Sequence, residues 1–269
     1  MSFFEKVVAF LQVTNESPTN YGGFHLVSIG LCVLVTVLLC VFAKDVSNRT
    51  FRKIIGVMWL AIVGLEIYKQ IVFSFNAETV TWDYSWYAFP YQLCSTPLYL
   101  LPFVVFAKDG KFRDGVMMFI STFAFFGGVC VMVFPNDVFA TQLLGVQIQT
   151  MVHHSVQIIS GIYIVVYYRN RIKKRSFAFA IVIFIVLLTL AMVLNIVMYH
   201  VLDESFNMFY ISPYYGCHLP ILSGIYAAVP YVVFFFIYSL GFILASVVMI
   251  LLIVGGIKLC DFISEKVKG

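Results

Sequence analysis

Charged residues are scarce in this sequence: they make up 11% of it, whereas hydrophobic residues make up 62%. The mean hydropathy of +0.97 lies far above that of a soluble domain. Apolar runs of about 20 residues recur along the chain, and each is long enough to cross a hydrocarbon core as a helix. The alternating ten-residue pattern of a membrane barrel is missing. We therefore predict an all-α integral membrane protein, a polytopic helical bundle.

Cysteine patterns that build scaffolds are missing as well. The six cysteines contain no CxxC pair and no framework spacing, which argues against a disulfide scaffold and a structural zinc site. No further ligand at a characteristic spacing accompanies Cys94, His153 and His154, so we expect no metal and no other cofactor. A disulfide among Cys94, Cys130 and Cys217 is an alternative that would remove a free thiol.

A recognisable signal peptide is also missing. The amino-terminal stretch FFEKVVAFLQV is short, carries Glu5 and Lys6, and lacks a small-residue cleavage site. It is typical of an amphipathic segment that lies on a membrane surface. The net charge of +4 requires no nucleic acid, because the topology described below explains it.

Seven apolar segments are expected to span the membrane within one domain, residues 1–269. A short extracytoplasmic segment, residues 1–23, precedes them, and a short cytoplasmic tail, residues 259–269, follows. The expected spans are His25–Ala43, Phe51–Phe75, Tyr91–Ala107, Gly115–Phe134, Gln149–Tyr168, Phe177–His200 and Val229–Lys258.

Lysine and arginine are absent from three connections, residues 76–90, 135–148 and 201–228, which are rich in aromatic residues instead. The other connections and the tail, counted together with the adjoining ends of the spans, hold 15 of the 17 basic residues. By the positive-inside rule the basic connections are cytoplasmic, so the amino terminus lies outside and the carboxyl terminus inside. We expect the plasma membrane of a bacterium.

Polar and ionisable side chains gather in the outer half of the expected spans and just outside it. Burying an ionisable group in a bilayer costs on the order of a few kcal/mol, so such a layer is expected to line a cavity rather than face lipid. Glu66 and Lys69 are one turn apart and either neutralise each other or contact a substrate headgroup. The candidate substrate-binding residues are His25, Glu66, Lys69, Gln92, Gln157, Asn195, Asn207 and Tyr210.

The stretch FPYQLCSTPLYLLP places Cys94 near two prolines, Pro97 and Pro102. We expect a kinked membrane helix here, because a proline lacks a backbone N–H. The carbonyls that lose their donors, those of Leu93 and Leu98, then need other partners in an apolar medium.

A cysteine and a histidine at like depth are the minimum for an activated thiol. The imidazole accepts the proton and the thiolate attacks a carbonyl carbon. Cys94, His153 and His154 are at a similar depth, but adjacent helical residues point about 100° apart, so at most one histidine faces Cys94 directly. Periodicity does not decide which one. The alternatives are histidines that only bond between helices and a cysteine that only packs.

Two well-known classes of seven-span protein do not fit. A retinal protein needs a lysine within its last helix, and residues 229–257 contain none. The acidic-Arg-Tyr and NPxxY sequences of G-protein-coupled receptors are also missing.

Four short motifs together resemble a known family. They are FHL at residues 24–26, PYQLC at the third span, HHS in the fifth, and NMFYISP at residues 207–213, which is looser than the family pattern. In order and span number they resemble the YwaF-type bacterial membrane proteins and their animal relatives, the transmembrane protein 164 family. The resemblance implies a cysteine-dependent lipid acyltransferase, with Cys94 as nucleophile and His154 as base, His153 being the alternate.

The leading hypothesis is therefore a membrane-embedded acyltransferase or transacylase that works at the outer leaflet. Its partner would be a membrane lipid: a phospholipid, a lysophospholipid or another acyl ester. Asn195, Gln92 and backbone near Pro97 are candidate oxyanion donors. The alternative is a transporter or small-molecule-binding protein without catalysis, in which Glu66 and the histidines carry protons. A structural subunit of a larger complex is a third hypothesis.

Overall fold

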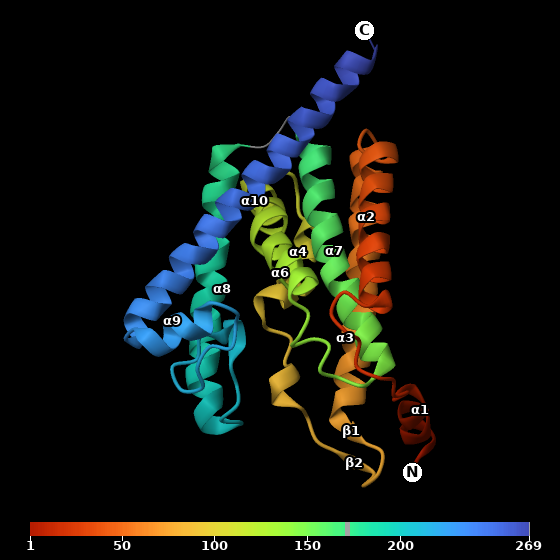
Figure 1. The fold of residues 1–269 in the computed structure, drawn as a ribbon, viewed down its shortest axis with the longest axis vertical. Coiled ribbons are helices and arrows are strands. Elements are labelled where there is room, and N and C mark those ends of the chain that lie inside the picture. Colours follow the sequence, from red (N-terminus) through yellow and green to blue (C-terminus); the bar gives the residue numbers. More distant parts are fainter. Residues whose placement is uncertain (170–172, 269) are drawn as a thin grey trace.

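The chain forms a helical bundle with one short antiparallel hairpin (Figure 1). The computed structural model describes residues 1–169 and 173–268; Arg171 and Gly269, parts of the predicted basic connection and tail, lie outside them. The helices are α1 (Phe3–Leu11), α2 (Gly23–Phe42), α3 (Asn48–Ser74), α4 (Thr96–Phe106), α5 (Lys111–Phe119), α6 (Phe125–Val133), α7 (Leu144–Tyr168), α8 (Lys174–Val201), α9 (Leu222–Ala228) and α10 (Tyr231–Lys268). The strands are β1 (Phe75–Asn76) and β2 (Thr81–Trp82), and short turns are η1 (Trp86–Ala88), η2 (Leu93–Ser95), η3 (Ile120–Ala124) and η4 (Met208–Tyr210).

Five helical segments of the described chain are long and apolar enough to cross a membrane, and each corresponds to a predicted span. They are α2, α3, Lys111–Val133, α8 and the Tyr231–Leu259 part of α10. The other two predicted spans form α4, which has 11 residues, and α7, which carries many polar side chains. α7 lies in the middle of the bundle and packs against α2, α3 and α6.

The Lys111–Val133 segment is not a uniform α-helix. α5 and α6 are joined by η3, a five-residue π-helical turn in which every residue is buried. η3 packs against α7 and α10. A π turn holds more residues than an α turn, so it changes the rotation of α6 relative to α5. The hydropathy pattern of the sequence does not signal this turn.

The Cys94 stretch forms a tight turn followed by a helix, not one kinked helix. Cys94 lies in η2, a 3-10 turn, and α4 begins at Thr96 with Pro97 in its first turn. The prediction that Pro97 kinks a helix is therefore wrong. A proline fits a helix start, where its missing N–H would have no intrahelical partner in any case. Pro102 does lie inside α4.

The two carbonyls predicted to need other partners both have them. The Thr96 hydroxyl donates to Leu93 O at 2.7 Å, and Trp59 Nε1 donates to Leu98 O at 3.0 Å. Because Trp59 belongs to α3, its bond to Leu98 O joins α3 to α4. In a regular helix the N–H of residue 102 would make this bond, but Pro102 has none. Side chains thus replace the backbone donors that a regular helix would supply.

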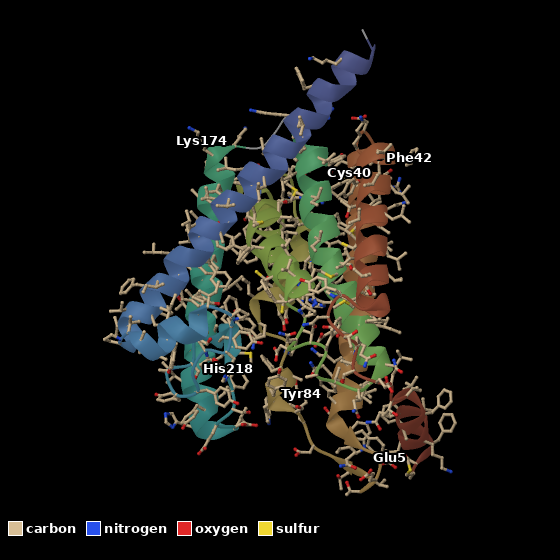
Figure 2. The ribbon with its side chains drawn as sticks, viewed as in Figure 1. Glu5, Cys40, Phe42, Tyr84, Lys174 and His218 are labelled. Atoms are coloured by element: carbon tan, nitrogen blue, oxygen red, sulfur yellow. The ribbon has the colours of Figure 1, made fainter. Side chains whose placement is uncertain are left out.

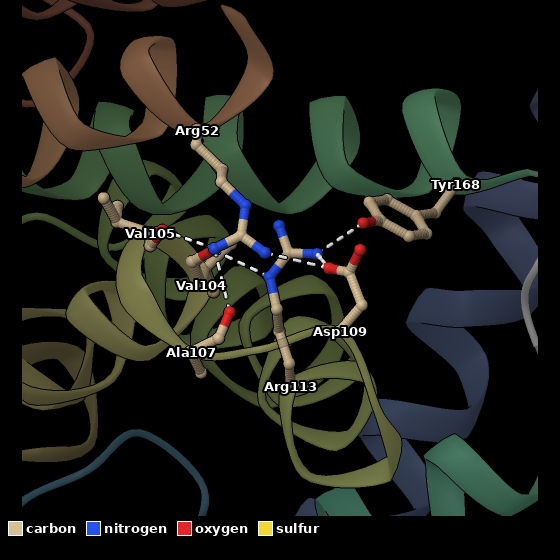
Figure 3. Close-up of polar contacts among 7 residues, drawn as sticks. All are labelled: Arg52, Val104, Val105, Ala107, Asp109, Arg113 and Tyr168. Carbon is tan, nitrogen blue, oxygen red and sulfur yellow. Dashed lines mark hydrogen bonds and ion pairs between the residues drawn. The ribbon is translucent and has the colours of Figure 1, made fainter. Parts of the chain in front are cut away.

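Two arginines cap the carboxyl-terminal end of α4 (Figure 3). Arg52 of α3 donates to Val105 O and Ala107 O at 2.7 and 2.8 Å. Arg113 of α5 donates through Nε to Val104 O at 2.8 Å. The last carbonyls of a helix have no intrahelical donors and carry partial negative charge. The arginines therefore cap α4 and join it to its two neighbours.

The two ends of the bundle differ in composition. The end that we call the basic end holds the connections before α3 and α5 and the start of α8, with Phe42 and Lys174 located there (Figure 2). The opposite end, which we call the aromatic end, holds α1 and the hairpin (Figure 1). α1 exposes Phe3 and Phe10, buries Val8 and contacts α3.

We predict that removing the indole donor destabilises the contact between α3 and α4. Trp59→Phe keeps an aromatic ring but leaves the Leu98 carbonyl without a donor, so the free energy of unfolding should fall by about 1–3 kcal/mol. Thermal unfolding of the purified protein in lipid nanodiscs measures the loss. Pro102→Ala supplies a backbone N–H to the same carbonyl, so the loss should be smaller in that background. An equal loss in both backgrounds would contradict this role of Trp59.

Candidate functional site

The backbone carbonyl of Cys94 lies against α7. His153 Nε2 donates to Cys94 O at 2.8 Å, and Gln157 Nε2 donates to the same oxygen. A carbonyl oxygen only accepts hydrogen bonds, so both side chains must be the donors. His153 and Gln157 lie one turn apart on α7, and both are buried. The structure thus brings Cys94 and His153 into direct contact and fixes the backbone at the thiol.

Backbone partners also determine which tautomer each of the two histidines adopts in its neutral form. His153 bonds through Nε2–H, which leaves a lone pair on its Nδ1. His154 Nδ1 donates to Thr150 O at 2.6 Å, which leaves a lone pair on its Nε2. Both nitrogens with lone pairs are buried and have no partner in the described structure, as is also true of Gln157 Oε1. This part of α7 therefore presents three buried hydrogen-bond acceptors.

Two glycines of α6 allow the close approach of η2, α6 and α7. A Cβ on Gly128 would lie 2.9 Å from Gln157 Cβ and 3.0 Å from the His154 carbonyl oxygen. A Cβ on Gly127 would lie 4.0 Å from the Cys94 Cα. Small residues let membrane helices pack with their backbones close together. At position 128 any residue larger than glycine would occupy the space that Gln157 and the His154 carbonyl of α7 now fill.

An ion pair between buried Glu66 and partly buried Lys69 occupies the neighbouring face of α3. Lys69 Nζ lies 2.8 Å from Glu66 Oε1, so the two charges neutralise each other. Gln70 donates to the same oxygen at 2.6 Å, and Gln149 of α7 donates to Glu66 Oε2 at 3.2 Å. Gln149 is one turn before His153 on α7. The carboxylate therefore joins α3 to the helix that carries both histidines.

Gln92, two residues before Cys94, holds a strained turn at η4. Its Nε2 donates to Asn207 O at 2.8 Å, and its Oε1 accepts from Phe209 N at 2.7 Å. Phe209 and Tyr210 have φ angles of 57° and 56°. Bulky residues rarely adopt this left-handed region, which costs about 1–3 kcal/mol each. The hydrogen bonds from Gln92 help to keep the chain in this conformation.

Two asparagines hold the same turn from other sides. Asn195 of α8 donates to Met208 O at 2.9 Å and accepts from Met208 N at 2.6 Å. Asn207 donates to Gly216 O at 2.6 Å and accepts from Ser212 N at 2.9 Å. The three amides predicted to contact a substrate, those of the two asparagines and of Gln92, thus bond to backbone here.

The strained turn carries Tyr210, which also has a side-chain partner. The Tyr210 hydroxyl donates to Asp137 Oδ2 at 3.1 Å. Burial, and then the charge of Asp137, raises the pKa of Tyr210 well above its ordinary value. The hydroxyl therefore stays protonated and acts as a donor.

His25 has a different set of partners. Its Nδ1 accepts from Tyr21 N at 3.0 Å, so Nε2 carries the proton and donates to Met132 O at 3.0 Å. Its ring packs edge-on against Phe139, with centroids 5.3 Å apart. Both ring nitrogens are engaged, and they join the start of α2 to the end of α6. These are the contacts of a packing histidine.

The cysteines near the site are not cross-linked. Cys94, Cys130 and Cys217 carry free thiols, so the alternative disulfide among them is not formed. Among residues 1–169 and 173–268, no group of three or more histidine, cysteine or acidic side chains is arranged to hold a metal ion.

Two residues of the site are missing from the sequence prediction: Gly128 and Asp137. The Gly127–Gly128 pair within an apolar segment is a signal that could have identified the close helix contact. The sequence does predict Gln149 on the face of α7 that carries His153, because the two lie one helical turn apart. Asp137 lies in a loop, and nothing in the sequence pairs it with Tyr210.

We predict that Asn195→Ala releases the strained turn. The variant leaves the N–H and the carbonyl of Met208 without partners, which should cost about 1–3 kcal/mol for each group. Limited proteolysis in nanodiscs should then cut within residues 207–216 faster than in the wild type. Thr189→Ala, a change on the exposed side of the same helix, is the control. Equal cutting rates for the two variants would contradict the role of Asn195.

Comparison with known proteins identifies a family whose model matches this chain. The model of a family described as the TMEM164 family matches residues 20–215, which include α2 to α8 and the η4 turn. No curated protein and no solved structure gave a match. The matched region covers well over half of the chain and contains Cys94, both α7 histidines and the residues that hold the strained turn. The chain therefore belongs to the TMEM164 family.

Proposed function

We propose that the protein is a membrane-embedded acyltransferase or transacylase that uses Cys94 as its nucleophile. The observation that supports this most directly is the arrangement at Cys94: its carbonyl is held by His153 and Gln157, beside a second histidine with a free lone pair on Nε2. Cys94 lies in η2, two residues before Thr96, where α4 begins.

The proposed reaction has two steps. His154 Nε2 takes the thiol proton of Cys94, and the sulfur attacks the carbonyl carbon of a lipid ester. The ester C–O bond breaks, the leaving alkoxide takes the proton from the imidazolium, and a thioester remains. The hydroxyl of an acceptor lipid then gives its proton to His154 and attacks the thioester, and the thiolate leaves and is reprotonated. Water in place of the acceptor would make the protein a lipase.

His153 is better suited to positioning than to proton transfer, because its Nε2–H already bonds to the nucleophile's backbone. His154 instead bonds to the Thr150 carbonyl on its own helix, and that bond selects the tautomer a base requires. We keep His153 as the alternate base, because its Nδ1 also has a free lone pair.

The oxyanion of each step needs donors. Gln92 and Asn195, the side chains considered from the sequence, already donate to backbone carbonyls. The amino-terminal N–H groups of α4 beyond Pro97 are better candidates, since the first N–H groups of a helix have no intrahelical acceptor. Lys69 and Tyr210 would contact the lipid headgroup, and Glu66 would hold Lys69 in place.

The membrane arrangement that we propose has seven spans, with α4 and α7 added to the five apolar segments. The basic end would be cytoplasmic and the aromatic end outside. Cys94 would then face the outer leaflet of a bacterial plasma membrane, where a phospholipid or lysophospholipid can enter sideways. We take residues 1–269 as a single domain.

A second function is favoured by the Glu66–Lys69 ion pair. Ionisable side chains within a membrane protein often mark a path for protons or a binding site for a polar solute. In that case Cys94 would only pack. The protein would be a transporter or a binding protein.

We predict that a lipid ester probe labels Cys94. The wild type in nanodiscs should form a hydroxylamine-sensitive adduct with an alkyne-tagged acyl ester, and Cys94→Ala should abolish it. Cys130→Ala, which removes a free thiol of α6, is the matched control and should label normally. Labelling that survives in Cys94→Ala would exclude the proposed nucleophile.

The two histidines should differ in their effects. His154→Ala should slow labelling about 10²-fold or more, the usual contribution of a general base. His153→Gln keeps an amide donor for Cys94 O and should slow it less. The opposite order would make His153 the base. A protein in which neither change matters, but in which Glu66→Gln abolishes uptake of a solute into vesicles, would be a transporter.

A further inference from the structure

The basic end contains a second polar cluster, far along α4 from Cys94 and unused by the proposed reaction (Figure 3). Arg52 Nη2 and Arg113 Nη1 both donate to one oxygen of Asp109, at 2.9 and 2.6 Å. Arg113 Nη1 also donates to the Tyr168 hydroxyl at 2.5 Å. The cluster joins α3, the α4–α5 connection, α5 and α7. Its three charged groups are two cations and one anion.

One edge of Arg113 is unpaired. The side chain is 1% exposed, and a guanidinium has five N–H donors. Nε and Nη1 are engaged, but Nη2 is buried without a hydrogen-bond partner in the described part of the chain. A buried donor of a charged group that lacks an acceptor costs more than a neutral one. The cluster therefore has donor capacity for a further acceptor.

The charges of the cluster do not balance. Asp109 offsets one of the two guanidiniums, and the carboxyl-terminal end of α4 contributes about half a negative charge more. The exposed lysines nearby, Lys53, Lys108 and Lys111, add further positive charge. Two guanidiniums this close repel each other unless anionic groups lie between them. The cluster is therefore suited to bind an additional anion.

Asp109 is the accessible member of the cluster. Its side chain is 62% exposed, against 22% for Arg52 and 1% for Arg113. It serves both arginines through a single oxygen, so its displacement would free one N–H of Nη1 beside the unpaired Nη2, while the other N–H stays bonded to Tyr168. A phosphate presents several oxygens and can accept from both nitrogens of such a fork.

We propose that Arg52 and Arg113 form a binding site for a singly charged phosphate group, and that Asp109 competes with it. A phosphodiester lipid headgroup at the basic end has this charge and lies at the right level of the bundle. Free phosphate offers the same chemistry from solution. The site is independent of acyl transfer at Cys94.

The test is a binding titration of the full-length protein in zwitterionic detergent, read by native mass spectrometry. The probes are short-chain phosphatidylglycerol, short-chain phosphatidylcholine and inorganic phosphate. Arg52→Gln should weaken binding of phosphatidylglycerol about tenfold or more, because it removes a charge-assisted hydrogen bond. Asp109→Asn should tighten it about tenfold, because it removes the competing anion. Phosphatidylcholine, whose choline cation neutralises the charge of its phosphate, should bind more weakly.

Matched controls separate this site from general surface charge. Arg49→Gln and Asp45→Asn each remove one exposed charge at the same end of the bundle and should change the affinity less than about twofold. Thermal unfolding checks that each variant is folded, and Arg113 is left intact because it is fully buried.

Arg52→Gln and Asp109→Asn together distinguish a phosphate-binding site from a cluster that only caps α4. A cap alone predicts that Asp109→Asn destabilises the protein and tightens nothing. The proposal is overturned if Arg52→Gln behaves like Arg49→Gln, or if Asp109→Asn binds no more tightly than Asp45→Asn. Binding of inorganic phosphate with the same variant pattern, and no preference for the lipid, would support the site and assign it to a soluble phosphate.

Discussion

A backbone carbonyl in an apolar medium has to find a donor, and much of this structure follows from that requirement. α4 and the turn before it leave several carbonyls without regular helical partners. Each of them is met by a side chain: Thr96, Trp59, Arg52 and Arg113, and at Cys94 both His153 and Gln157. Because these donors come from α3, α5 and α7 as well as from α4 itself, the same bonds hold the bundle together around α4.

The chemistry of the site depends on this use of donors. A histidine that donates one N–H to a backbone carbonyl has only a lone pair left on its other nitrogen. The bonds to Cys94 O and Thr150 O therefore do more than position two rings; they determine which nitrogen of each can take a proton. The amides of Gln92 and Asn195 are engaged in a similar way, and they hold the strained turn of Phe209 and Tyr210 in place.

Hydropathy predicted the helical segments well because lipid-facing surfaces need apolar residues over a fixed length. Proline chemistry likewise predicted that Leu93 and Leu98 would need other donors, although not that Trp59 would be one. The prediction of a kink at Pro97 failed because the local sequence does not show whether a proline starts a helix or lies inside one and kinks it. The pairing of Cys94 with α7 could only be suspected from the sequence, because contacts between helices depend on their rotation. That rotation is set here by Gly128 and the π turn η3, which hydropathy does not register.

The π turn has a consequence for how this protein tolerates changes in length. η3 already contains a residue beyond what an α-helix would need, upstream of the two glycines that face α7. Deleting one residue from Ile120–Ala124 would give a regular helix and would turn α6 by about 100° relative to α5. The helix would keep its hydropathy and its hydrogen bonds, yet Gly127 and Gly128 would point elsewhere. A relative with such a deletion could therefore keep the membrane fold while losing the close packing around Cys94.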